Sequence, residues 1–319
     1  MPTHTTLIVN PMARGGWLKK KWPVIEPILQ RTLGPLEIVF TKRQGDGRPL
    51  ARQALEQGAK LVLAMGGDGT ASEVASGLLE FQDQTAAGEP LAGFGIIPAG
   101  TGGDLGRILG TPRDIEQAAQ KIAQSPGRLI DAGRIQYVAN DGQPASGYFI
   151  NVAEAGVGGL VDVYANESKK PFGGRVAYFW ASLRGTLNYK NAAVRVRIDD
   201  QPEKELRAYL IAAANGGYFG AGMHVAPNAV IDDGLFEIVM IGDLSFPEKV
   251  NLGRHIYAGT HLSLPKISCV RGRRLTIEPI ETAEGGVRAS PVLLDIDGEA
   301  PGRLPATFTI LPKAIRLRG

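Results

Sequence analysis

The sequence has almost no cysteine, little net charge and no long apolar run. Cys269 is the one cysteine in 319 residues, which excludes an internal disulfide framework and fits a reducing compartment. The formal net charge of +3 is too small to indicate a nucleic-acid partner. No stretch approaches the ~20 apolar residues that cross a bilayer, and no signal peptide is evident. We therefore expect a cytoplasmic protein without a transmembrane segment.

Glycine is abundant instead, with 42 residues, and one glycine-rich stretch organises the chain. The apolar run Leu61–Met65 predicts a buried parallel strand, and Gly66-Gly67-Asp68-Gly69 directly after it predicts a tight turn. A helix should follow, with Thr70 and Glu73 forming a capping box. The free N–H groups and the positive dipole end of such a helix favour a bound phosphate. Asp68 beside it suits the placement of a metal ion or a hydroxyl.

A second turn of the same kind occurs at Gly95–Asp104, where Gly100-Thr101-Gly102-Gly103 follows an apolar strand. Taken alone, a glycine turn is as consistent with a purely structural strand–turn–helix unit as with a ligand site. Two such turns after adjacent strands should converge where open α/β sheets bind ligands. Arg14, in an earlier glycine-rich turn, could contact phosphate or lie in solvent.

The order of expected elements predicts two kinds of sheet. Strands alternate with helices at 49–57 and 113–124 in the first part, which indicates a parallel sheet with strands at 5–9, 36–40, 61–65 and 91–97. After residue 128 short strands follow one another with few helices, beginning with a hairpin that turns at Asn140-Asp141-Gly142. Further strands are expected at 148–152, 193–198, 208–213, 235–241, 274–278, 292–296 and 306–310. The fold class is therefore an N-terminal open parallel α/β nucleotide-binding domain followed by an antiparallel β-rich domain.

Two segments leave alternatives open. The basic run Lys19–Lys21, flanked by Trp17 and Trp22, indicates an ordinary helix face rather than a membrane contact. Residues 176–187 predict an amphipathic helix that either packs on the sheet or forms a wall of a lipid-entry cleft, with Lys169, Lys170 and Arg175 before it. Its apolar face consists of Val176, Phe179, Leu183 and Leu187.

Several motifs together resemble the diacylglycerol kinase catalytic-domain family, which includes bacterial lipid kinases and sphingosine kinases. The similarity extends from Asn10-Pro11 through both glycine turns to Ala214–Gly222, Asp232–Leu235 and Asp297-Gly298-Glu299. It implies an ATP-binding domain at 1–130, a β-rich lipid-substrate domain at 131–303, and a C-terminal strand within 304–319 that returns to the first domain. Gly103 departs from the asparagine usual in the family, and Ser72 stands where asparagine is common.

The resemblance also assigns roles. Glu299 would be the general base, and Asp68 the second catalytic residue. ATP would be bound by Asn10, Thr41, Gly66, Gly67, Asp68, Gly69, Thr70, Ala71, Ser72, Glu73, Gly100 and Thr101. A structural Mg²⁺ ion would be held by Asp233 with the carbonyl groups of Val230 and Leu235, in a network that includes Asp131.

The expected activity is transfer of the γ-phosphate of ATP to a hydroxyl of a lipid such as diacylglycerol or a sphingoid lipid. The partner would be a lipid at a membrane surface, with the enzyme peripherally associated, and a homodimer is left open. The alternatives are a non-catalytic nucleotide-binding regulator, suggested by Gly103, and a kinase of a soluble substrate similar to NAD kinases. An isolated Asp-Gly-Glu is by itself a plain turn sequence.

Overall fold

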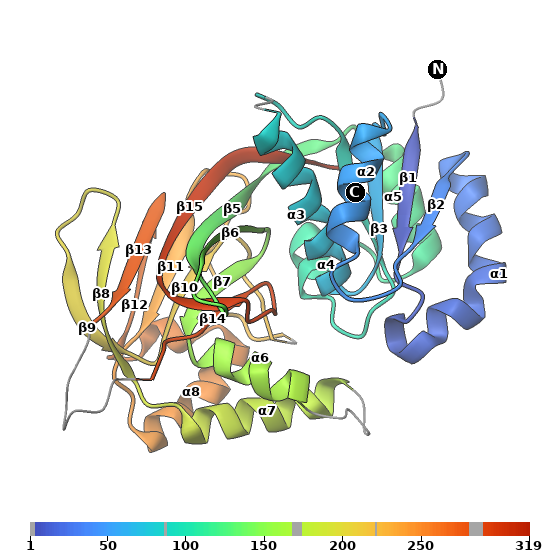
Figure 1. Cartoon of the computed structure of the whole chain (residues 1–319). Helices are drawn as coiled ribbons and strands as arrows, with labels where there is room; N and C mark the ends of the chain where they lie inside the picture. The colour runs from blue at the N-terminus through green and yellow to red at the C-terminus, as the bar shows by residue number, and fades with distance from the viewer. Residues whose placement is uncertain (1–3, 86–87, 168–173, 221, 281–289) are drawn as a thin grey trace. The chain divides into compact units, whose positions relative to one another are not determined.

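The computed structural model describes residues 4–85, 88–167, 174–220, 222–280 and 290–319, with side chains except those of 166–167 and 174–179 (Figure 1). The chain divides into two compact units. Unit 1 consists of Met1–Ala132 with Pro312–Gly319, and unit 2 of Gly133–Leu311. Strands β5 (Arg128–Ala139) and β15 (Gly302–Leu317) carry the chain from one unit to the other.

Unit 1 contains a parallel sheet, as the sequence predicts. Its strands pair in the order β2-β1-β3-β4, and every pair among them is parallel. The residues of β1 and β3 are almost all buried, which explains why these strands appear in the sequence as continuous apolar runs. The strands are β1 (Thr5–Val9), β2 (Glu37–Phe40), β3 (Leu61–Gly66) and β4 (Gly93–Pro98).

Helices cover both faces of this sheet (Figure 1). Buried residues of α1 and α5 share one hydrophobic core with Leu7, Leu63 and Ile97 of the strands. Helices α2 and α3 pack against each other and contact β1 and β3. The helices of unit 1 are α1 (Ala13–Leu33), α2 (Gly47–Glu56), α3 (Asp68–Gln84), α4 (Asp104–Leu109) and α5 (Ile115–Gln124).

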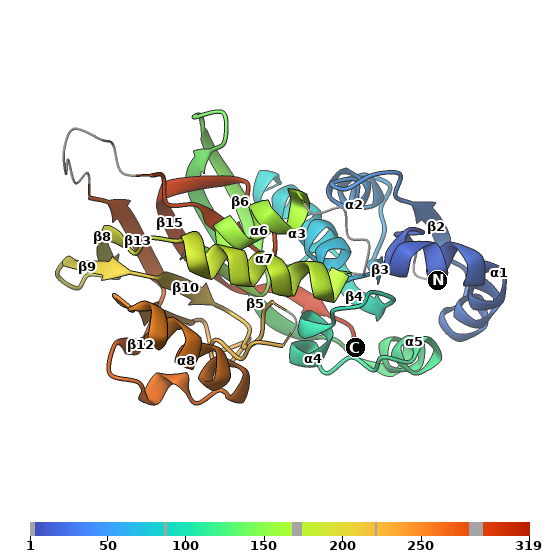
Figure 2. The same ribbon diagram turned by 90° about the horizontal axis from the view of Figure 1, so that it is seen from below.

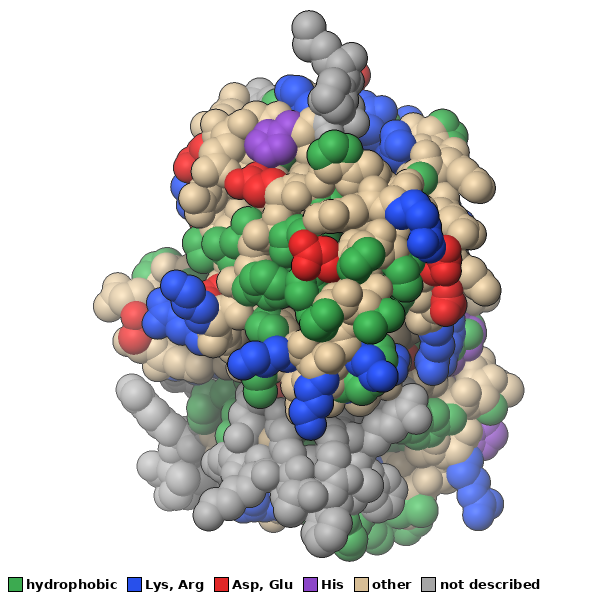
Figure 3. All heavy atoms as spheres, turned by 90° about the vertical axis from the view of Figure 1, so that its right-hand side faces the viewer, with side chains coloured by type: hydrophobic (Ala, Val, Ile, Leu, Met, Phe, Trp, Pro, Cys, Tyr) green, Lys and Arg blue, Asp and Glu red, His purple; other side chains and the backbone are tan. Residues whose placement is uncertain are grey.

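The basic run Lys19–Lys21 lies on exposed positions of α1. Its two tryptophans are both engaged within unit 1. The Arg14 guanidinium lies 5.2 Å from the centroid of the Trp17 ring, and Trp22 packs edge-on against Phe40 at 5.2 Å. These contacts are those of an ordinary helix face. Figure 3 shows the side of the molecule that faces right in Figure 1, where hydrophobic side chains gather in the middle and Lys and Arg side chains lie around and below them.

The end of β15 adds a further strand to the sheet of unit 1. Arg316 and Leu317 pair in parallel with Gly93 and Phe94 of β4. The earlier part of β15, at Ala306–Thr309, pairs antiparallel with β13 in unit 2. The expected return of the last strand to the first domain is thus confirmed, although the strand is longer than the predicted 306–310.

Unit 2 is built from antiparallel strands. Strands β12-β11-β10-β7-β14 form a five-stranded sheet, and β9-β8-β13 continue to β15 in a second sheet, in which β5 pairs with β15 and with β6. The hairpin between β5 and β6 turns at Gly142, as predicted. The remaining strands are β6 (Pro144–Phe149), β7 (Val152–Gly156), β8 (Ala192–Ile198), β9 (Lys204–Ala208), β10 (Leu210–Ala214), β11 (Phe236–Ile241), β12 (Ile267–Gly272), β13 (Arg274–Pro279) and β14 (Leu294–Ile296).

A hydrophobic core lies between the two sheets of unit 2. Phe149, Phe236 and Phe308 are fully buried there. The rings of Phe149 and Phe236 stack at 5.5 Å, and Phe308 meets Phe149 edge-on at 6.5 Å. Such aromatic pairs add roughly 0.5–1.5 kcal/mol to the effect of burial alone. This core fixes the five-stranded sheet whose ends carry the candidate site of unit 2.

Three helices cover the outer face of the five-stranded sheet (Figure 2). They are α6 (Val157–Glu167), α7 (Gly174–Asn188) and α8 (Phe246–Ala258), and the short helix η1 (His261–Ser263) follows. Buried residues of all three, such as Val161, Ala181 and Ile256, share a core with β10 and β11. Among the described helices of the chain, none is long and apolar enough to cross a membrane.

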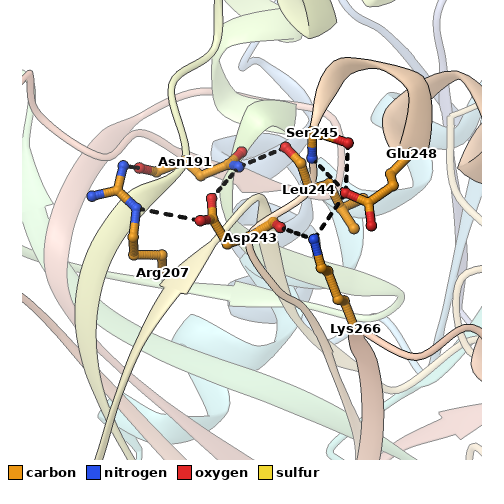
Figure 4. Close-up of polar contacts among 7 residues, drawn as sticks. All are labelled: Asn191, Arg207, Asp243, Leu244, Ser245, Glu248 and Lys266. Carbon is orange, nitrogen blue, oxygen red and sulfur yellow. Dashed lines mark hydrogen bonds and ion pairs between the residues drawn. The ribbon is translucent and has the colours of Figure 1, made fainter.

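Polar contacts fix the start of α8 to the segment that follows α7 (Figure 4). The Glu248 carboxylate accepts hydrogen bonds from the Ser245 N–H and hydroxyl, each at 2.7 Å, and from Lys266 Nζ at 2.9 Å. The Ser245 hydroxyl and then Lys266 lower the pKa of Glu248 to about 2. Asn191 donates to Asp243 at 2.6 Å and to the Leu244 carbonyl at 2.8 Å.

Helices α6 and α8 of unit 2 were not predicted. Gly158 and Gly159 in the first turn of α6 are poor helix formers, whereas Ser245 and Glu248 form a capping box at the start of α8. On α7, Leu183 and Leu187 of the predicted apolar face are exposed while Ala181 is buried, so these two leucines do not pack on the sheet. The alternative, a wall of a lipid-entry cleft, stays a prediction. The side chains of Val176 and Phe179 lie outside the described residues.

The packing of α2 on α3 generates a stability prediction. A Cβ at Gly77 would overlap the Arg48 carbonyl oxygen and approach the Ala51 Cβ to 2.9 Å. We expect Gly77→Ala to lower the free energy of unfolding by about 1–3 kcal/mol, because the two helices would have to separate. Gly69→Ala, on the same helix with open space around it, should be neutral or stabilise by up to about 1 kcal/mol. Urea unfolding of both variants measures this, and equal effects would contradict it.

Candidate functional site

The two glycine turns of unit 1 meet backbone to backbone. The Ala99 N–H donates to the Gly66 carbonyl oxygen at 2.7 Å. A Cβ at Gly100 would overlap the Cα of Gly67, so no other residue fits there without moving the turn. The turns follow the adjacent parallel strands β3 and β4, at the edge of the sheet where open α/β folds bind ligands.

Asp68 ties the second turn to the first. Its Oδ2 accepts hydrogen bonds from the N–H groups of Gly103 at 2.8 Å and Asp104 at 3.1 Å. Gly103 has φ of 115°, a conformation that residues with a side chain rarely adopt. Glycine in place of the family's asparagine therefore has a conformational reason in this chain.

Asn10 and Thr41 extend this edge of the sheet. Asn10 Nδ2 donates to Thr70 Oγ1 at 3.1 Å, and its Oδ1 accepts from the Met12 N–H at 3.0 Å. The buried Thr41 follows β2 and donates its N–H to the Val9 carbonyl at 2.9 Å. The ends of β1, β2 and β3 thus lie together with the start of α3.

The predicted capping box at the start of α3 is wrong. The helix begins at Asp68, with Gly67 as its N-cap, so Thr70 already lies in the first turn. Glu73 therefore does not form a capping box with Thr70 as the N-cap. Its carboxylate accepts from the N–H groups of Gly45 and Gly47, each at 2.9 Å, and so satisfies donors at the start of α2. Sequence spacing alone could not distinguish these two partners.

The rest of the predicted nucleotide-binding set lies around the two turns. In the first part of α3, Gly69 is exposed, Ala71 is buried and Ser72 is partly buried. Thr101, in the second turn, is exposed. Arg14 Nε donates to the Gly100 carbonyl at 3.0 Å, so Arg14 supports the second turn. The start of α3 offers N–H donors and a positive dipole end next to glycines without side chains, which is an environment for a phosphate anion.

The Asp297-Gly298-Glu299 turn of unit 2 is fixed by its first residue. The Asp297 carboxylate accepts three backbone N–H groups, from Ile150 at 3.0 Å, Asn151 at 3.1 Å and Val152 at 3.0 Å. Asp297 has φ of 51°, a left-handed conformation that a turn requires here. Glu299 is exposed at the end of this turn. The arrangement presents one exposed carboxylate on a fixed backbone, as a general base requires.

Asn215 belongs to the same assembly. This buried residue of the segment 214–222 donates from Nδ2 to the Ile150 carbonyl at 2.9 Å, and its N–H donates to the Asn151 carbonyl at 2.9 Å. Asn151 Nδ2 in turn donates to the Tyr218 carbonyl at 2.8 Å. No sequence motif pointed to Asn151, whereas Asn215 lies in the motif Ala214–Gly222, to which no role was assigned.

The residues predicted to hold Mg²⁺ are engaged otherwise. The Asp233 carboxylate accepts the Leu235 N–H at 3.0 Å and forms an ion pair with Arg271, and Val230 is exposed. In unit 1, the buried Asp131 accepts the Lys313 N–H at 2.7 Å. Among the described residues, no group of three or more His, Cys, Asp or Glu side chains is arranged to hold a metal ion. The predicted Mg²⁺ site is of another kind, one Asp233 carboxylate with the carbonyl groups of Val230 and Leu235, and it stays a prediction.

Comparisons with known proteins agree with the motifs. The family model of the diacylglycerol kinase catalytic domain matches residues 4–135. The model of the YegS C-terminal NAD kinase beta sandwich-like domain matches residues 151–319, more than half of the chain.

Relatives match over most of the chain. A diacylglycerol kinase of Staphylococcus carnosus (strain TM300) is 26% identical over 319 residues, which cover 99% of this chain and 95% of the relative. A probable YegS-like lipid kinase of Chromohalobacter salexigens is 33% identical over 206 residues, 65% of this chain and 61% of the relative. The crystal structure of a diacylglycerol kinase from Bacillus anthracis str. Sterne shares the fold, with a TM-score of 0.69 and 23% sequence identity. The match covers 99% of this chain and 96% of that structure. The chain belongs to the diacylglycerol kinase family, with the catalytic domain in its N-terminal part and a YegS-type domain in its C-terminal part.

Proposed function

We propose that the protein is an ATP-dependent lipid kinase that transfers the γ-phosphate to a hydroxyl of a lipid such as diacylglycerol or a sphingoid lipid. The observation that carries the proposal is the Asp297-Gly298-Glu299 turn, in which three hydrogen bonds to Asp297 fix the backbone that presents the exposed Glu299. Membership of the kinase family supports phosphoryl transfer, and the paired glycine turns of unit 1 support polyphosphate binding.

In this mechanism, unit 1 binds Mg-ATP as a substrate, with the polyphosphate against the turns of Gly67 and Gly100. Asp68 Oδ1 takes no part in the two bonds from Gly103 and Asp104, so it would be the oxygen with which Asp68 could help to hold Mg²⁺ of the nucleotide. Glu299 accepts the proton of the lipid hydroxyl. The hydroxyl oxygen forms a bond to the γ-phosphorus while the bond to the β-γ bridging oxygen breaks, and ADP leaves.

We further propose that the enzyme acts from the cytoplasm at a membrane surface, where the hydroxyl of its lipid substrate is accessible. The non-catalytic regulator has less support than the sequence suggested, because the conformation of Gly103 accounts for the absence of asparagine. A kinase of a soluble substrate would use the same glycine turns, so the acceptor panel below includes soluble hydroxyl compounds.

Replacing the proposed base tests the reaction. We expect Glu299→Gln to lower kcat about 10²–10⁴-fold with an unchanged KM for Mg-ATP, because proton acceptance is lost while the turn is kept. The measurement is transfer of labelled γ-phosphate from Mg-ATP to organic-extractable lipid, with a panel of hydroxyl lipids on anionic vesicles. Glu203→Gln, another exposed glutamate of unit 2, should retain full activity. Full activity of Glu299→Gln would remove the assignment, and no transfer by the wild type to any lipid would remove the lipid-kinase proposal.

Asp68 should govern nucleotide binding through the second turn. Asp68→Ala removes the acceptor of the Gly103 and Asp104 N–H groups, and hydrogen bonds to a charged acceptor contribute about 1.5–3 kcal/mol each. We expect the Kd for Mg-ATP to rise at least roughly tenfold, measured by isothermal titration calorimetry. Asp83→Asn, an exposed position near the other end of α3, serves as the control. An unchanged Kd for Asp68→Ala would mean that the second turn does not contact the nucleotide.

A further inference from the structure

Three carboxyl groups are buried between the five-stranded sheet and α6. Glu154 on β7 and Asp295 on β14 are paired directly across the strands, so their side chains lie on the same face. Val152, two residues from Glu154, belongs to the core on the helix side of the sheet, so this is the face that α6 covers. Asp162 lies on α6. Glu154 is 0%, Asp162 4% and Asp295 5% exposed.

These carboxyl groups have no compensating positive charge in the described part of the chain. None of the ion pairs formed by the described residues includes any of the three. Both oxygens of Glu154 and Oδ2 of Asp162 lack a hydrogen bond of standard geometry among the described residues, and the Gly158 N–H opposes the rise in the pKa of Glu154 only in part. Three buried, adjacent negative charges without a cation would be strongly unfavourable, so protons must neutralise part of the cluster.

The pKa shifts agree with this conclusion. Burial, followed by the nearby Asp295 carboxylate, raises the pKa of Asp162 to about 10. Burial and Asp295 raise the pKa of Glu154 well above its ordinary value. Burial raises the pKa of Asp295 to about 7. Near neutral pH Asp162 therefore holds its proton, and Asp295 ionises before Asp162 as the pH rises.

The groups around the cluster are mostly acidic or phenolic. Asp297 and Glu299 on the adjoining turn add negative charge, and Tyr189 and Tyr209 lie near Glu154. Burial raises the pKa of Tyr209 to about 12, so this phenol is neutral at physiological pH. On α8, Lys249 Nζ lies 4.8 Å from the Tyr209 ring and donates to the Tyr189 carbonyl at 2.9 Å, so this cation is engaged with the two tyrosines.

The cluster is connected to the turn that carries the proposed base. Asp295 Oδ1 accepts the Gly298 N–H at 2.7 Å. Asp162 and Asp295 are neighbours, and donation from one carboxyl to the other raises the pKa of Asp162 and opposes the rise in the pKa of Asp295. A protonated Asp162 can donate to an ionised Asp295, which then accepts more strongly from Gly298. The chain of contacts therefore runs from α6 through β14 to the residue directly before Glu299.

We propose that Asp162 and Asp295, assisted by Glu154, form a proton-holding cluster that positions the Gly298–Glu299 turn for the reaction. They are positioning residues, because they act on Glu299 through the backbone of Gly298. The inference rests on the proposed function for its catalytic consequence, but the proton content of the cluster and the order of the turn can be measured without any activity.

The pH dependence of stability tests the proton content. The folded protein keeps the Asp162 proton from about pH 4, where an aspartate of the unfolded chain ionises, up to about pH 10. Raising the pH through this window therefore favours unfolding of the wild type, by up to about tenfold per pH unit in the unfolding equilibrium constant. Asp162→Asn keeps a neutral donor but has no proton to lose. Its stability relative to wild type should rise steadily from pH 5 to pH 9.

Urea unfolding at pH 5, 7 and 9 measures this difference. Glu237→Gln is the matched control, because Glu237 is buried on the same sheet but lies 3.7 Å from Arg271 Nε. Glu237→Gln should lower the free energy of unfolding, and its difference from wild type should not shrink as the pH rises. Parallel curves for wild type and Asp162→Asn would overturn the proposal. Stabilisation of the wild type by Na⁺, K⁺ or Mg²⁺ chloride that Asp162→Asn abolishes would also overturn it, since a cation would then neutralise the cluster.

Hydrogen exchange and kinetics test the positioning role. The Gly298 amide should exchange slowly in wild type and in Asp162→Asn, and at least tenfold faster in Asp162→Leu, measured by mass spectrometry of a peptide that spans the turn. In the lipid kinase assay, Asp162→Leu should lower kcat about tenfold at an unchanged KM for Mg-ATP, and Asp162→Asn should largely restore it. Equal exchange in all three proteins would overturn the positioning role. If the wild type phosphorylates no lipid, the proposed function fails, while exchange and stability still decide this inference.

Discussion

Backbone N–H groups in the tight turns need acceptors, and in each unit an aspartate of the signature motif supplies them. Asp68 accepts two N–H groups from the following glycine turn, and Asp297 accepts three from the segment before β7. In both cases the acceptor comes from another part of the chain than the donors. Removing the carboxylate would leave several buried donors unpaired, at about 1–3 kcal/mol each. The geometry of the candidate site residues in each unit depends on this constraint.

The sequence predicted most of the fold because its signals are local. Continuous apolar runs before glycine turns identified β3 and β4, and an alternating pattern before Asn140-Asp141-Gly142 identified β5 and its hairpin. The meeting of the two glycine turns also followed from local information, since the carboxyl ends of adjacent parallel strands share one edge. The return of β15 to unit 1 came from the family resemblance, and the structure confirms it.

The features that the sequence did not predict have a common cause, because each depends on contacts between distant segments of the chain. Glu73 has the spacing of a capping box with Thr70, but the N–H groups of Gly45 and Gly47 lie closer to its carboxylate. The apolar stripe of α7 suggested a buried face, yet Ala181 and Gly185 form the close contacts with the rest of unit 2. The burial of Glu154 and Asp162 could not be predicted from the sequence, because an acidic residue normally indicates an exposed position.

Burial separates the carboxylates of unit 2 into different functions. Asp297 is committed to backbone donors, and Glu299 is exposed, so the two acids of one turn cannot exchange roles. Asp295 lies behind them with its oxygen on the Gly298 N–H, and its charge depends on whether neighbouring acids keep their protons. The buried acids thus explain how an exposed glutamate can be held on a fixed backbone beside several carboxyl groups.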